Sequence, residues 1–155
     1  MRKVFALLIP ILLLSGCLST AENTVPQEAE TLQIVEQIWE NNSYQFWNLA
    51  PMSMGNITTF SFNETGDVNI TVELDVFFHE PLIWEQGHLN YTLIHGNETV
   101  FSHELSEGEM SFHINVSNVS NITMEIRASG TDNATDTHTG DWFIARTHCE
   151  MKKEI

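Results

Sequence analysis

Three aspartates lie close together in the stretch 130–141, which reads GTDNATDTHTGD. They are Asp132, Asp136 and Asp141, and carboxylate-rich loops are a common source of the oxygen ligands that calcium binds. The spacing differs from that of an EF-hand loop, which requires a glycine at its sixth position and a glutamate at its twelfth. An ordinary solvated turn is therefore the favoured interpretation, and a structural calcium ion bound by these aspartates is the alternative. No other cofactor is predicted.

Three of the histidines, His95, His103 and His113, lie in neighbouring segments with strand-like alternation. Imidazole is a common zinc ligand, but a structural zinc site needs about four ligands that converge on one point. The sequence contains no HxH or HExxH pair, and His113 falls on the outward phase of its segment. These histidines are therefore predicted to be ordinary strand or loop residues.

Signatures of catalysis are missing from the sequence. There is no GxSxG elbow, no phosphate-binding loop and no Cys–His arrangement typical of a nucleophile and its base. Glu73 and Asp75 are a candidate acid–base pair, but they share the outward face of one strand, as solvated side chains do. The chain is therefore predicted not to be an enzyme.

Two tryptophans are candidates for ligand contact. Trp84 lies in the loop EPLIWEQGH (80–88), and an exposed ring there would offer a platform on which the CH face of a sugar can stack. Trp142 follows the polar loop and begins a strand-like segment, so it is the second candidate. For Trp142, a position in the core is the favoured alternative.

The triplet Asn-x-Ser/Thr, which is the acceptor sequence for N-glycosylation, is unusually frequent. Ser and Thr make up 26 of the 155 residues, so chance predicts about two such triplets among the thirteen asparagines. Ten asparagines begin one: Asn41, Asn56, Asn63, Asn69, Asn90, Asn97, Asn115, Asn118, Asn121 and Asn133. Selection for N-glycosylation is the favoured explanation, and the strand propensity of Thr-rich surface sequences is the alternative.

The N-terminus has the three parts of a secretion signal in their usual order. Arg2 and Lys3 are followed by an apolar stretch over 4–14, which is too short to span a bilayer, since that takes about 20 residues. The stretch ends in Leu14-Ser15-Gly16-Cys17, which resembles the lipobox of prokaryotic lipoproteins. The resemblance implies that Cys17 receives a diacylglyceryl group and that residues 1–16 are then removed. Two acyl chains hold a protein stably on a membrane. We therefore expect lipid anchoring at the extracellular face of the cell membrane. A lipobox together with dense sequons implies an archaeal cell surface.

The processed chain would be strongly acidic. Removal of residues 1–16 leaves four basic residues against 21 acidic ones, a formal net charge of −17. Nucleic acids and anionic lipid head groups are poor partners for such a surface, whereas neutral ligands such as sugars are not excluded. If Cys17 is lipidated, Cys149 has no disulfide partner within the chain. Three roles are then open for Cys149: a small buried residue, a cysteine that forms an intermolecular disulfide, or an exposed thiol.

The periodicity of the sequence divides the chain into a tether, a domain and a tail. Residues 17–31 are polar and are expected to be a flexible tether. Over 32–40 the pattern favours a short amphipathic helix, with a strand as the alternative. From residue 57 onward the period is two. Strands are predicted over 68–78, 88–95, 98–105, 110–116, 122–128 and 142–148. This pattern predicts a mainly β domain, an antiparallel β-sandwich over 32–148, followed by a C-terminal tail over 149–155.

One stretch resembles a known family. From about residue 88 to 148, a hairpin is followed by EGxxSFxIxVSxxxxIxxEI and by an acidic loop that runs into GDWFIAR. This succession resembles the galactose-binding-like jelly-roll modules, which implies a jelly-roll sandwich and, in many such modules, carbohydrate binding. We therefore expect a noncatalytic surface module that binds glycans or envelope proteins. The alternative is a structural or adhesion component of the envelope without a small ligand.

Overall fold

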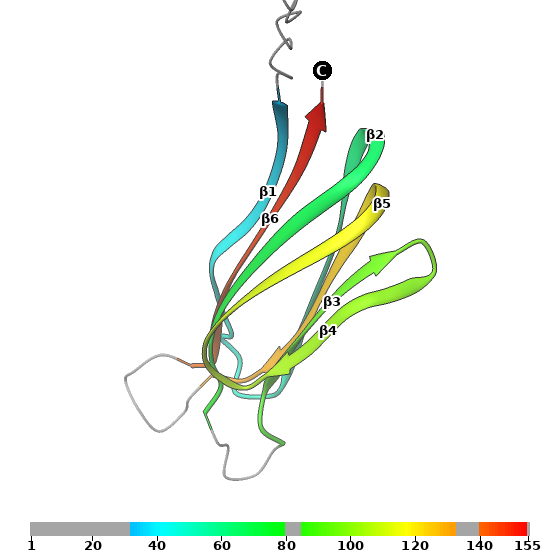
Figure 1. The fold of residues 1–155 in the computed structure, drawn as a ribbon. Coiled ribbons are helices and arrows are strands. Elements are labelled where there is room, and N and C mark those ends of the chain that lie inside the picture. The colour runs from blue at the N-terminus through cyan, green and yellow to red at the C-terminus, as the bar shows by residue number, and fades with distance from the viewer. Residues whose placement is uncertain (1–31, 80–84, 133–139, 155) are drawn as a thin grey trace, which may run out of the picture.

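The computed structural model describes residues 32–79, 85–132 and 140–154. The expected signal segment, Cys17 and the expected tether lie outside the described residues. Within the described part all regular structure is β, in one antiparallel sheet with the order β1-β6-β2-β5-β3-β4 (Figure 1). The strands are β1 (Leu32–Gln45), β2 (Met52–Phe77), β3 (His88–His95), β4 (Glu98–Leu105), β5 (Glu107–Gly130) and β6 (Trp142–Glu154).

Strands β2 and β5 are long, and they bend together so that the sheet folds into two layers (Figure 1). Layer one contains β1, β6, the second half of β2 and the first half of β5. Layer two contains the first half of β2, the second half of β5, β3 and β4. The pairing between β2 and β5 is irregular only near the bend, between Ser61 and Val68. The result is the predicted antiparallel sandwich.

The tandem sequon NVSNVSNIT (115–123) forms the bend in β5. Val116, Val119 and Ile122 are buried, whereas the asparagine that precedes each of them is exposed. Every third residue of this stretch therefore points into the core, and here the chain passes from one layer to the other. Asn118 has a φ of 61°, which asparagine tolerates better than most residues. The two predicted strands over 110–116 and 122–128 are thus the halves of one bent strand.

The core lies between the two layers. It is filled mainly by side chains that were predicted to point inward. The inward residues of β2 between Val68 and Val76 are all buried, as is Phe78 just beyond the strand. In β5, Ile122, Met124, Ile126 and Ala128 are buried as predicted. Met110 was predicted to point inward as well, but 40% of it is exposed, because it lies on the first half of β5 at the edge of layer one.

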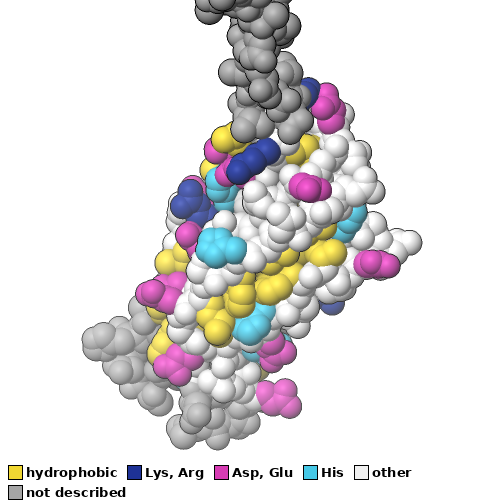
Figure 2. Space-filling view, in the orientation of Figure 1, with side chains coloured by type: hydrophobic (Ala, Val, Ile, Leu, Met, Phe, Trp, Pro, Cys, Tyr) yellow, Lys and Arg dark blue, Asp and Glu magenta, His cyan; other side chains and the backbone are white. Residues whose placement is uncertain are grey.

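The sandwich is less tightly closed between β4 and β5. Phe101 and His103 of β4 lie with their ring centroids 4.8 and 4.9 Å from the ring of Phe112 in β5, and all three rings are half-buried. Figure 2 shows a band of hydrophobic side chains across the face in view, with acidic side chains around it.

The helix predicted over 32–40 is wrong, because this segment is part of strand β1. Val35 and Trp39 pack against the core, while Ile34 and Ile38 are about half exposed on the other side. The apolar residues fit a helical period and a strand period equally well. Pairing with β6, from Leu32 opposite Glu154 to Gln45 opposite Trp142, selects the strand. β-Branched and aromatic residues also favour this state.

Strand β6 runs to Glu154, through most of the stretch in which a tail was expected. Its inward alternation continues past residue 148 through Cys149 and Met151, both of which are buried. Burial raises the pKa of the Cys149 thiol to about 12. Since the thiolate is the reactive form, Cys149 is a small core residue rather than a reactive thiol.

Candidate functional site

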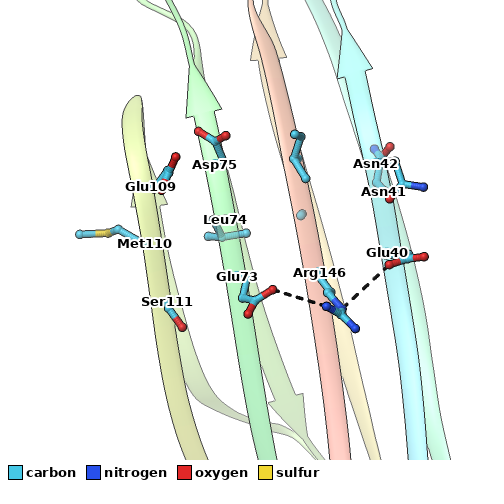
Figure 3. Close-up of a pocket in the computed structure, with 12 residues that line it drawn as sticks. Glu40, Asn41, Asn42, Glu73, Leu74, Asp75, Glu109, Met110, Ser111 and Arg146 are labelled. Carbon is cyan, nitrogen blue, oxygen red and sulfur yellow. Dashed lines mark ion pairs between the residues drawn. The ribbon is translucent and has the colours of Figure 1, made fainter.

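An open depression lies on the outer face of layer one, the side that points away from the core. It has a volume of about 620 Å³ and takes its lining from β1, β2, β5 and β6. The lining residues are Glu40, Asn41, Asn42, Glu73, Leu74, Asp75, Glu109, Met110, Ser111, Ile144, Ala145 and Arg146. Figure 3 shows these side chains spread across the neighbouring strands.

The first row of this face is polar. Register places Glu73 of β2 opposite Arg146 of β6, and Arg146 opposite Glu40 of β1. The guanidinium lies 3.9 Å from each carboxylate, so it bridges the two (Figure 3). All three side chains are about half exposed, and ion pairs of this kind contribute little stability. Arg146 therefore presents hydrogen-bond donors between two acceptors at the surface.

The second row lies two residues further along each strand. Asp75 stands opposite both Glu109 and Ile144. The side chain of Ile144 is 36% exposed and separates the carboxylates from β1. This row adds two acidic acceptors and one apolar contact.

The third row is aromatic. Phe77 of β2 pairs with Trp142 of β6, and the two rings stack with centroids 6.4 Å apart and an interplanar angle of 23°. Phe77 is 37% exposed and Trp142 is half-buried. Trp142 therefore lies on the outer face, whereas a core position was favoured from the sequence. The buried neighbour of Trp142 is Phe143. Two rings fixed by mutual contact offer an apolar platform at the end of the polar rows.

A third ring, Trp47, was missed by the sequence analysis. It is 71% exposed, on the segment that leaves β1. Phe46, beside it, is fully buried, and its backbone N–H donates to the carbonyl of Asp141 at 2.9 Å. The next residue, Asn48, accepts at its carbonyl from the Asp132 N–H at 2.7 Å. These bonds hold the segment in place, so the exposure of Trp47 is a fixed feature. The alternation of side-chain direction along Gln45-Phe46-Trp47 was the signal in the sequence that could have placed Trp47 on the exposed side.

The carboxylate of Asp141 is a structural group. It is buried, with 1% exposed. One oxygen accepts from the backbone N–H of His79 at 2.9 Å and contacts the His79 ring nitrogen Nδ1 at 2.5 Å, and the other accepts from the Thr131 N–H at 2.8 Å. Asp141 thus joins the segments that follow β2 and β5 to the start of β6.

The calcium hypothesis is left without support by these contacts. Both oxygens of Asp141 already accept protein hydrogen bonds, Asp132 is half-buried and Asp136 lies outside the described residues. Among the residues that the structure describes, no group of three or more His, Cys, Asp or Glu is placed to hold a metal ion. The site stays a prediction from the sequence.

The three candidate histidines occupy different surroundings. His103 packs against Phe112 between the layers, and His113 lies on the outer face, where its Nδ1 is 3.2 Å from the hydroxyl of Thr71. His95 ends β3 beside the hairpin turn. His103 thus has a local role in packing and His113 one in hydrogen bonding. Trp84, the first candidate for a ligand platform, lies outside the described residues.

Sequons are found on both outer faces. Asn69 and Asn115 lie on layer one, where the Asn115 amide donates to the Asn69 carbonyl oxygen at 2.8 Å. Asn90 and Asn121 lie on layer two. Asn63, Asn97 and Asn118 are exposed near the bend or in the β3–β4 turn, and Asn41 and Asn56 are half-buried. Asn133 lies outside the described residues.

Comparison of the sequence with protein-family models finds no match, nor does comparison with curated proteins. Among solved structures, the carbohydrate-binding module TmCBM61 in complex with β-1,4-galactotriose has a TM-score of 0.46 and 9% identity, over 79% of this chain and 88% of that chain. A pilus protein of Bacillus endospore appendages has a TM-score of 0.37 and 11% identity, over 78% and 90%. A chain of infectious bursal disease virus, Gx strain, has a TM-score of 0.34 and 10% identity, over 78% and 32%. With TM-scores below 0.5, these similarities say nothing about the ligands of this chain.

In the part of the chain that the structure describes, no helix is long and apolar enough to cross a bilayer.

Proposed function

We propose that this chain is a lipid-anchored, noncatalytic module of the outer cell surface that binds neutral carbohydrate on the outer face of layer one. The observation that supports the proposal best is the arrangement of that face. A stacked ring pair, Phe77 and Trp142, lies one row beyond a depression whose lining includes four carboxylates and the Arg146 guanidinium.

This arrangement suits the chemistry of a sugar. The CH face of a pyranose is apolar and packs on an aromatic ring, while its hydroxyls both donate to carboxylates and accept from a guanidinium. Neighbouring rows are two residues apart along a strand, which is about 6.8 Å. The face from Phe77 to Glu73 therefore has the length of an oligosaccharide rather than a single sugar unit.

The charge of the face favours neutral sugars over acidic ones. Glu40, Glu73, Asp75 and Glu109 line the depression, and Arg146 is the one cationic side chain among its lining residues. Figure 2 shows acidic side chains spread over the face in view, with fewer Lys and Arg side chains. A uronic acid or sulfated sugar would meet repulsion there.

A binding assay with matched variants tests this proposal. The purified full chain in detergent is expected to bind at least one of three immobilised neutral polysaccharides, β-1,4-galactan, β-1,4-mannan and xyloglucan, and not polygalacturonate. Trp142→Ala should weaken binding about tenfold or more, which corresponds to about 1.4 kcal/mol. Ile57→Ala removes a side chain that is 68% exposed on layer two and should leave binding unchanged. Preference for polygalacturonate, or equal effects of the two variants, would contradict the proposal.

A structural role in the envelope is the second candidate, and the sequons on both outer faces favour it. Glycans at Asn69 and Asn115 would cover one end of layer one, and those at Asn90 and Asn121 would cover part of layer two. A chain that binds none of the polysaccharides in its unglycosylated form would support this role over carbohydrate binding.

A further inference from the structure

The sequon asparagines that the structure describes differ in exposure. Each of them begins a complete Asn-x-Ser/Thr triplet, so the triplet itself does not distinguish them. Three are half-buried, namely Asn41, Asn56 and Asn90. The others are exposed, namely Asn63, Asn69, Asn97, Asn115, Asn118 and Asn121.

The exposed sequons gather at one end of the sandwich, where β2 and β5 bend. Glu64 in the bend of β2 contacts Lys153, near the end of β6, with an N–O distance of 2.6 Å. The end of β6 also pairs with the start of β1, since Leu32 stands opposite Glu154. Figure 1 shows the bend at the same end of the domain as these two strand ends, and we call it the bend end. The expected tether joins the domain at this end.

The exposed sequons lie on several sides of the bend end. Asn69 stands opposite Asn115 on the outer face of layer one, and Asn121 lies on the outer face of layer two. Asn97 lies in the β3–β4 turn, which points toward the bend end because the last pair between β3 and β5 contains Thr123, next to the bend. Glycans on these asparagines would therefore cover several sides of the bend end.

Asn41 and Asn56 have a different orientation. Asn41 of β1 stands opposite Ala145, and Asn56 of β2 stands opposite Ile126. Both of these partners are fully buried. Residues directly opposite each other in an antiparallel pair point to the same side of the sheet. Both asparagines thus lie on the core-facing side of their strands. The Asn56 side-chain oxygen also accepts from the Thr58 hydroxyl at 2.9 Å.

The folded chain has no room for a glycan on the core-facing side, whatever the order of modification and folding. If modification came first, a bulky hydrophilic group would have to enter the space between the layers, at a cost that a marginally stable domain cannot offset. If folding came first, the modifying enzyme could not reach the amide. Exposure in the folded chain should therefore decide which sequons carry a glycan.

We propose that this chain carries its N-glycans at the bend end, on the exposed sequons, and that Asn41 and Asn56 stay unmodified. The proposal goes beyond carbohydrate binding and stands without it. Phe77 of the ring pair lies about 27 Å along β2 from Asn69. In a lipid-anchored chain the glycans would thus lie on the membrane side of the domain, and the ring pair on the far side. Asn90, half-buried on the outer face of layer two, belongs to neither group.

Site occupancy in the folded chain tests this proposal. The full chain is expressed in a host that N-glycosylates its secreted proteins, and the folded fraction is isolated by size-exclusion chromatography in detergent. Peptide mass spectrometry then gives the occupancy of each sequon. Ile57→Asn is the matched variant, because it creates a triplet over 57–59 whose acceptor is next to Asn56 but on the outer side, where Ile57 is 68% exposed. Ser43→Thr gives Asn41 a threonine in its triplet, as Asn56 already has.

We expect glycans at the bend end of the folded chain and none on Asn41 or Asn56. In Ile57→Asn, position 57 should be modified while Asn56 stays empty, and Ser43→Thr should leave Asn41 empty. A glycan on Asn41 or Asn56 of the folded chain, or a bend end without glycans, would overturn the proposal. An unmodified position 57 would also overturn it, because the side of the strand would then not decide occupancy. Carbohydrate binding is measured separately, so its failure would leave this result intact.

Discussion

Replacement of Asp141 by alanine is expected to destabilise the domain by about 3–5 kcal/mol, because two buried backbone N–H donors lose their acceptor at about 1–3 kcal/mol each. The carboxylate is buried and accepts from two backbone N–H groups while contacting the His79 ring. Without it, those donors face the core unsatisfied, and three segments at one end of the sandwich lose their connection. The midpoint of thermal unfolding should fall by roughly 10–20 °C for a chain of this size. Circular dichroism of the full chain in detergent measures it.

Two further variants separate the role of the hydrogen bonds from the loss of volume. Asp141→Asn keeps the shape, but its NH₂ group would face either the Thr131 N–H or the His79 N–H, so we expect a loss of about 1–3 kcal/mol. Asp67→Ala removes a carboxylate from an exposed position and should change stability by less than about 0.5 kcal/mol. An Asp141→Ala chain as stable as Asp67→Ala would show that Asp141 is not the structural group described here.

Replacement of Cys17 by serine is expected to abolish lipid attachment completely. A serine has no thiol to form the diacylglyceryl thioether. Since removal of residues 1–16 follows lipidation in the lipoproteins that the N-terminus resembles, Cys17→Ser should also retain those residues. Intact-mass spectrometry of protein from the native membrane measures both changes. Cys149→Ser is the matched control and should keep the lipid, because Cys149 is buried in β6.

The same spectra can contradict lipid anchoring. If the wild-type chain lacks the lipid adduct and Cys17 forms a disulfide with Cys149, the protein is a secreted, disulfide-closed domain and has no lipid anchor. Such a bond would require Cys149 to leave a position where none of it is exposed. The anchor is therefore tested without reference to the sugar site.

The parts of the fold that depend on local alternation could be predicted from the sequence. Val68 to Val76 and Ile122 to Ala128 alternate strictly, and the structure buries the predicted side of both. The Gly96-Asn97 turn between β3 and β4 is likewise a local signal, and Gly96 has a φ of 61°. Local patterns fail where two periods fit equally well, as in β1, where pairing with the distant strand β6 decides the state.

The candidate site depends on contacts that no local pattern contains. The row of Glu40, Arg146 and Glu73 exists because β6 inserts between β1 and β2, and that order is set by the whole sheet. The sequence drew attention to Asp141 as a calcium ligand, whereas its structural role depends on His79, 62 residues away. Trp142 could be found from the sequence, but its place on the outer face follows from its pairing with Phe77.

Amide NMR of the unglycosylated full chain in detergent tests the central claim, carbohydrate binding on the outer face of layer one, most directly. The titrant is β-1,4-galactotetraose, β-1,4-mannotetraose or a xyloglucan oligosaccharide, according to which polysaccharide the chain binds. We expect saturable shifts that are largest at Phe77, Trp142 and Arg146, with Ile57 and Glu125 of layer two unchanged. Saturable shifts centred on layer two, or no saturable shifts with any of the three sugars, would contradict the assignment of carbohydrate binding to this face.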